Sequence, residues 1–205
     1  MHISPVQHDA LVELLNIGFG RAGASLSRLT NQRVLLDVPL VAVHPVDQLS
    51  AHLSTVIHDE VASVHQAFSG PVGGDALLIL DPVAASTLKE LLTDEPALPL
   101  TLDASSREVL TEVGNILLNA CIGTFGNLLN VSMSFAVPDI DVATLQSVVD
   151  RLLHAGDDSF RYALVVTAGF RLRDAEVTGY VVIVLTVQSL TRLLVAVEGW
   201  EREQH

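Results

Sequence analysis

Two long stretches of the chain carry apolar residues with the spacing of an α-helix. In the first stretch, Ser4, Pro5 and Gln7 form a helix start with a capping box, and the helix is predicted to end at residues 30–32. The second is predicted to begin at a capping box formed by Ser105 and Glu108 and to run to about Leu129. One stripe of the first helix is apolar: Leu11, Leu14, Leu15, Gly18, Ala22, Leu26 and Leu29. Each helix therefore has one face suited to a core.

The segments between and after these helices are rich in valine and leucine, and turn residues separate them. They predict strands at 34–46, 61–68, 76–80, 131–137, 161–171 and 177–185, with shorter helices at 82–92, 145–154 and 188–197. Pro39 and Pro45 give the first strand the character of an edge strand. Residues 198–205 form a polar tail that is expected to fray.

A pair of polar residues occurs once on each long helix, three residues apart, so that both side chains share a face. The pairs are Glu13 with Asn16 and Glu112 with Asn115, separated by an offset of 99 residues. A proline follows the asparagine by 23 residues in both places. The glutamate, the asparagine and the proline each recur after 99 residues, which indicates an internal duplication.

The order of one long helix, three strands and a shorter helix, found twice, predicts an α+β fold. We expect a single domain over 1–205 in which two pseudo-two-fold repeats, about 4–93 and 103–198, share a mostly antiparallel sheet. The two long helices should then lie side by side, with shorter helices flanking them. Gly18, Gly20 and Gly23 predict close approach of another backbone to the first helix, either from a neighbouring helix or from a docked partner.

Composition excludes several classes of function. Of 205 residues, 49% are hydrophobic, which is enough for a well-buried core. The net charge is −13 and the 11 basic residues are dispersed, so the chain lacks the cationic surface that nucleic acid requires. The single cysteine, Cys121, excludes an internal disulfide, fits a reducing compartment and is expected in the core.

The sequence also predicts a cytoplasmic protein with no membrane insertion. The N-terminus has neither the basic nor the apolar region of a signal peptide. Residues 113–138 lack charge, but they carry four asparagines and a terminal proline, which are costly in lipid.

The repeated pair lacks the groups of a self-sufficient active site. An asparagine is no general base near pH 7, but it can hold a water in line for attack, as a glutamine does in GTP hydrolysis. A carboxylate one turn away is suited to pair with a lysine or arginine of a partner. The 8 histidines show no metal-ligand spacing, and Cys121 has no base near it in sequence. The pair therefore predicts a site that completes the active site of another protein.

The pattern Asp9-x-x-x-Glu13-x-x-Asn16 followed by Pro39 resembles the signature of the CheC/CheX/FliY family of bacterial chemotaxis phosphatases. Residues 15–27 are also similar to the first helix of that family, and two motif copies in one chain are the CheC arrangement. The resemblance implies dephosphorylation of a phosphorylated CheY-like receiver domain, with CheD as a possible second partner.

The same resemblance implies roles for the paired residues. Asn16 and Asn115 would position the hydrolytic water, while Glu13 and Glu112 would dock the receiver. Pro39 and Pro138, which close the two copies of the pattern, would be structural markers only. No cofactor of its own is implied, because the receiver supplies the Mg²⁺ and the phosphate.

The two copies differ from each other. The family usually has Ser or Asp four residues before the Glu; Asp9 fits this pattern and Glu108 does not, and its capping role explains Glu108 without a place in the site. Gly20 has Asn119 as its counterpart, which makes the two faces unequal and leaves room for one site to be the better catalyst.

Two alternatives remain open. The chain could be a non-catalytic interaction or adaptor module, either binding CheD or resembling the middle domain of flagellar switch proteins, which lacks the Glu/Asn pairs. It could also be an independent hydrolase that uses Glu13 and Glu112 as an acid/base pair, which requires a substrate cleft between the two long helices.

Overall fold

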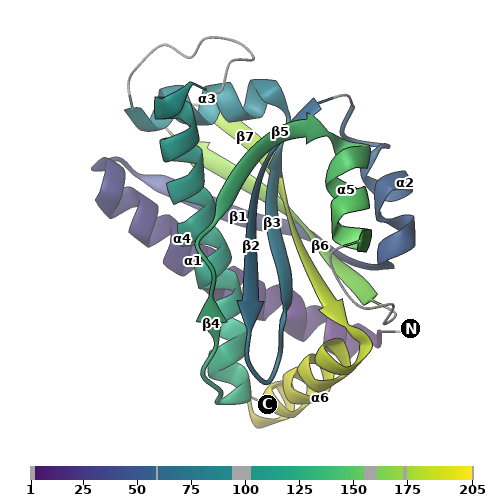
Figure 1. Cartoon of the computed structure of the whole chain (residues 1–205). Coiled ribbons are helices and arrows are strands. Elements are labelled where there is room, and N and C mark those ends of the chain that lie inside the picture. Colours follow the sequence, from purple (N-terminus) through teal and green to yellow (C-terminus); the bar gives the residue numbers. More distant parts are fainter. Residues whose placement is uncertain (1–2, 59, 94–102, 155–160, 173–174, 205) are drawn as a thin grey trace.

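The sheet is built from two hairpins that lie side by side, each extended by a strand from the other half of the chain (Figure 1). The computed structural model describes residues 3–58, 60–93, 103–154, 161–172 and 175–204. The strands are β1 (Val34–Pro45), β2 (Glu60–Ser69), β3 (Gly74–Leu80), β4 (Ser134–Phe135), β5 (Asp139–Thr144), β6 (Arg161–Leu172) and β7 (Ala175–Thr186). The helices are α1 (Pro5–Thr30), α2 (Leu49–Leu53), α3 (Pro82–Thr93), α4 (Ala104–Leu129), α5 (Leu145–His154) and α6 (Val187–Gln204), with a 3₁₀ turn η1 (Val46–Gln48).

The strand order has an internal two-fold symmetry. It runs β1-β6-β7-β3-β2-β4, with β5 also paired to β2, and every pairing among the described strands is antiparallel. Exchanging β1 with β5, β2 with β6 and β3 with β7 reverses this order and leaves the pairings unchanged. Because β1 pairs with β6 and β5 with β2, each half supplies an edge strand to the other. The predicted α+β fold, a single domain with a shared antiparallel sheet, is confirmed.

The sheet is covered on both faces, so its central strands are buried on both sides. On β7, Val181, Ile183 and Leu185 belong to the core shared with α1, α3, α4 and α6, while Val182 and Val184 belong to the core under α2 and α5. This explains why these strands read as continuous apolar runs rather than alternating ones.

The two long helices cross in contact, as the duplication predicts (Figure 1). A Cβ at Gly18 would lie 3.1 Å from the carbonyl oxygen of Ala120 and 3.2 Å from the Cα of Cys121. Gly23 is equally close to β1, with 3.2 Å between its would-be Cβ and the carbonyl oxygen of Val34. The predicted close approach is therefore confirmed at Gly18 and Gly23. Among the described residues nothing lies within 4 Å of a Cβ at Gly20, so approach by a docked partner stays a prediction there.

The predicted start of α1 is confirmed, and that of α4 is wrong. Ser4 and Gln7 form the reciprocal capping box, with Gln7 N–H donating to Ser4 Oγ at 3.2 Å. In α4 the N-cap is Asp103, whose Oδ1 accepts from the N–H of Ser106 at 2.7 Å. An aspartate is as good an N-cap as a serine, so the helix begins before the predicted box. Glu108 is exposed and has no capping role.

Three further elements differ from the prediction. The strand expected at 131–137 is only the two-residue β4, and the longer strand, β5, follows Pro138 instead. The short α2 was not predicted. Helix α6 continues to Gln204, so the tail is helical through that residue rather than frayed, and Trp200 in it packs against the core.

Helix α4 packs one face against the core and exposes the other. Among the described residues it is the one helix whose length and composition would allow it to cross a membrane, and 56% of its most apolar window is buried inside the protein. A buried core helix passes the same test. Cys121, at the contact with α1, is fully buried, and this burial raises the pKa of its thiol.

We therefore expect Cys121 to be inert in the folded protein, because the thiolate is the reactive form and neither solvent nor reagent reaches it. A chromogenic disulfide reagent at pH 8 should leave the native protein unlabelled over minutes and should label one thiol per chain in guanidinium. Rapid labelling of the native protein would show that the interface between α1 and α4 opens.

Candidate functional site

The first polar pair lies on the solvent-facing side of α1. Leu11, Leu14 and Leu15 point into the core, and the 100° step between helical residues puts Glu13 and Asn16 on the opposite side. Both are exposed, and neither makes a side-chain hydrogen bond or ion pair with any described residue. No described residue therefore occupies the oxygen or the nitrogen of the Asn16 amide.

The second polar pair is exposed only in part. Glu112 is exposed on α4, but Asn115 is half-buried. The Oδ1 of Asn115 accepts a hydrogen bond from Nδ2 of Asn119 at 2.7 Å and a longer one from Nε2 of Gln66 at 3.4 Å. The predicted inequality of the two faces is thus present in the structure, and Asn119 in place of Gly20 is one of its causes.

The other cause is the close packing of α4 on the sheet. A Cβ at Gly114 would lie 2.5 Å from Cγ1 of Val64 in β2, so the helix can approach β2 only because residue 114 has no side chain. This approach brings Asn115 within reach of Gln66, which is 1% exposed. Sequence analysis did not include Gln66, since nothing in its local pattern separates it from an outward-facing strand residue.

The two glutamates are not brought together. Glu13 precedes the crossing residue Gly18 by five positions, and Glu112 precedes Ala120 by eight. With a rise of about 1.5 Å per residue, Glu13 stands about 7.5 Å and Glu112 about 12 Å from this contact, each along its own helix. An acid and a base acting on one group must both be within hydrogen-bond reach of it. The geometry therefore does not support the independent hydrolase with an acid/base pair.

The proline markers occupy equivalent places at the two edges of the sheet. Pro39 lies in β1, where the register with β6 shifts between Asp37 and Leu40. Pro138 lies between β4 and β5, both of which pair with β2. Proline lacks the N–H needed within a ladder, so both positions fit edge strands with an irregularity.

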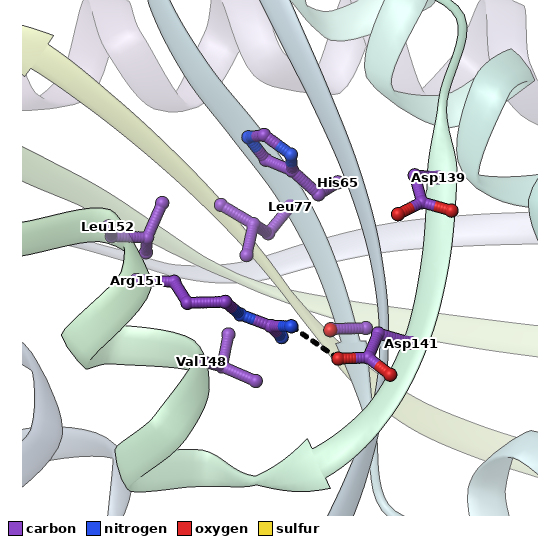
Figure 2. A pocket seen from close by; sticks show the side chains of 8 residues that line it. His65, Leu77, Asp139, Asp141, Val148, Arg151 and Leu152 are labelled. Atoms are coloured by element: carbon purple, nitrogen blue, oxygen red, sulfur yellow. Dashed lines mark hydrogen bonds and ion pairs between the residues drawn. The ribbon is translucent and has the colours of Figure 1, made fainter. Parts of the chain in front are cut away.

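A cavity of about 460 Å³ lies on the other face of the sheet, between α5 and the strands β2 and β5 (Figure 2). Arg151 forms an ion pair with Asp141 across its mouth, and the hydrogen bond from this guanidinium lowers the pKa of the Asp141 carboxyl. On the cavity wall His65 contacts Asp75 at 2.9 Å. The sheet separates this cavity from the motif helices, and sequence analysis did not point to it.

Within the ranges that the structure describes, no group of three or more His, Cys, Asp or Glu side chains is placed to hold a metal ion. The motif faces themselves offer one carboxylate and one amide each. Such a set can orient water and pair with a cation, and it carries no nucleophile.

Comparison with known proteins gives a similar sequence and several similar folds. The chain is 25% identical over 167 residues to the CheY-P phosphatase CheC of Bacillus subtilis, which is 80% of this chain and 79% of that protein. The fold is similar to that of Thermotoga maritima FliY, with a TM-score of 0.78 and 17% identity over 96% of this chain and 98% of the other. It is also similar to the FliM middle domain of Helicobacter pylori, with a TM-score of 0.67 and 12% identity over 95% and 99%. No family model matches the sequence.

Proposed function

Because this chain belongs to the CheC/CheX/FliY family, we propose that it acts in chemotaxis signalling as a phosphatase of a phosphorylated CheY-type response regulator. The proposal includes a cytoplasmic location, no cofactor of its own, and a receiver domain that brings both the aspartyl phosphate and Mg²⁺. The CheC relative of Bacillus subtilis is itself named a phosphatase of CheY-P.

The observation that carries the proposal is the exposed, unpartnered pair on α1. Asn16 projects from a rigid helix of 26 residues, which is anchored by its leucine face. A side chain held in this way can enter a partner's active site with little loss of conformational freedom on docking. Glu13, one turn away, is in place to bind a lysine of the same partner.

In the proposed reaction the attacking water is held by Asn16 in line with the bond between phosphorus and the aspartyl oxygen. The water oxygen forms a new bond to phosphorus as the aspartyl oxygen leaves, giving inorganic phosphate and a free aspartate. The Mg²⁺ expected in the receiver would neutralise the developing charge, and the contribution of this chain is to position the water. We assign Asn115 and Glu112 the same roles on α4.

The alternative function is a non-catalytic module of the chemotaxis or flagellar switch system, including an adaptor that binds CheD. The similarity to the FliM middle domain favours it, because that likeness covers nearly the whole chain. The exposed Glu/Asn pair on α1 favours the phosphatase, because an amide with no partner among the described residues is what holding the attacking water requires.

The experiment is a measurement of phosphate release from phosphorylated receiver domains, with and without the protein. We expect the protein to accelerate release from at least one CheY-type receiver, and chelation of Mg²⁺ to remove the acceleration. The proposal would fail if the protein bound phosphorylated receivers without changing the rate, which is the result expected of an adaptor.

A further inference from the structure

We infer that hydrogen bonds from Asn119 and Gln66 occupy the side-chain oxygen of Asn115 and so hinder it from binding the attacking water. The α1 site therefore carries most of the turnover, and the α4 site is slower. This inference rests on the proposed function and adds two positioning residues to it. It concerns a polar cluster between α4 and β2 that consists of the buried Gln66 and the half-buried Asn115 and Asn119.

The orientation of the Asn115 amide follows from the neighbouring bonds. Gln66 Nε2 donates to the backbone carbonyl of Ala136 at 2.9 Å, which fixes the nitrogen end of that side chain on the side of Asn115. Because Gln66 Nε2 is a donor, the atom of Asn115 that faces it is the oxygen Oδ1. The same oxygen accepts a hydrogen bond from Asn119 Nδ2 at 2.7 Å. Both acceptor directions of Asn115 are therefore turned towards the protein.

An amide oxygen that already accepts two hydrogen bonds from the protein is not available to the attacking water. To hold an attacking water, an amide oxygen accepts one of its protons while the water lone pair faces phosphorus. Asn16 has this oxygen available, whereas Asn115 can offer only its Nδ2–H₂ until the bonds to Asn119 and Gln66 break. The α4 site therefore needs a side-chain rearrangement that the α1 site does not need.

The two side chains that bind the Asn115 oxygen, Gln66 and Asn119, have no counterparts at the α1 site. Gly20 stands where the second half has Asn119, and it offers no side chain. Gln66 pairs with Ala76, two residues after Gly74 of its hairpin, and Val166 pairs with Val181, two residues after Gly179 of the other hairpin. Because the two hairpins hold equivalent places in the sheet, the equivalent of Gln66 is the apolar Val166. Both groups are therefore present at the α4 site only.

The cluster is also incompletely satisfied. Gln66 Oε1 and Asn119 Oδ1 are buried without a hydrogen-bond partner among the described atoms. Releasing Asn115 breaks its two hydrogen bonds but leaves Gln66 Nε2 bonded to the carbonyl of Ala136, so a docked receiver can release Asn115 at a modest cost. We therefore expect a slow second site rather than a dead one.

The test compares single-site variants in the phosphate-release assay. Asn16→Ala should lower the rate about tenfold, which corresponds to about 1.4 kcal/mol, whereas Asn115→Ala should lower it by no more than about twofold. Adding Asn119→Ala to Asn16→Ala should raise the rate several-fold above that of Asn16→Ala alone. Gln66→Val, which copies Val166, should act in the same direction.

The rise in rate caused by Asn119→Ala must come through Asn115. The triple variant with Asn16, Asn115 and Asn119 all changed to Ala should therefore show no such rise. A loss of stability cannot imitate a gain in rate, and urea unfolding of each variant checks that it folds. If Asn16→Ala keeps the wild-type rate, or if Asn119→Ala fails to activate it, the inference is wrong while the proposed function stands. If the wild-type protein accelerates phosphate release from no receiver, the inference and the proposed function are both wrong.

Discussion

Changing Asn16 and Asn115 together to alanine is expected to reduce the acceleration of receiver dephosphorylation by at least about 100-fold, the loss typical of removing one preorganised transition-state contact. The phosphatase supplies neither the metal nor the phosphate, so little catalytic power remains once both amides are gone. Binding should survive, because Glu13 and Glu112 stay in place to dock the receiver. The measurement is phosphate release at saturating protein.

The variant must be compared with one that loses an asparagine elsewhere. Asn127→Ala removes an exposed amide from α4, the helix that carries Asn115, and should leave the rate within twofold of wild type. Exposed substitutions of this kind change the free energy of unfolding by about 0.5 kcal/mol or less. Retention of most of the acceleration by the double variant would show that neither asparagine positions the water.

Gly74→Ala is expected to lower the free energy of unfolding by about 3 kcal/mol, at the upper end for overpacking a core. A Cβ at Gly74 would lie 2.0 Å from the carbonyl oxygen of Val184 in β7, which is a backbone atom that cannot rotate away. The added methyl group must therefore separate β3 from β7, the two strands at the centre of the sheet and at the junction of its halves.

Gly123→Ala is the matched control, because nothing lies within 4 Å of its would-be Cβ. On helix propensity alone it should stabilise the protein by up to about 1 kcal/mol. Urea unfolding followed by circular dichroism gives both values. Equal midpoints for the two variants would mean that β3 and β7 do not approach as closely as the structure shows.

Local patterns along the chain determined the elements whose signals are contained in neighbouring residues. The period of the leucines determined the two long helices, and Ser4 with Gln7 determined where α1 begins. The offset of 99 residues between the Glu/Asn pairs led to the duplication, and the turn residues led to the separate strands that pair as β2–β3 and β6–β7. Where two local signals competed, prediction failed: Asp103 and Ser105 are both good caps, and only the folded helix selects between them.

The remaining features depend on contacts between residues distant in sequence. The alternating segment after Pro138 becomes β5 because β2 offers it a free edge. The exchange of edge strands between the halves follows from pairing that no local pattern encodes. The inequality of Asn16 and Asn115 was anticipated from Gly20 and Asn119, but its second cause, Gln66, is 49 residues away on another strand.

The sequence by itself determined what chemistry is available, namely two amide and carboxylate pairs on the outer faces of two helices. Only the tertiary structure decided how free each pair is, because that freedom depends on how closely α4 approaches β2. Hydrogen bonds form over about 3 Å. A small change in the distance between a helix and a strand therefore decides whether an amide on the helix finds a partner inside the protein. That distance is set by packing across the whole core.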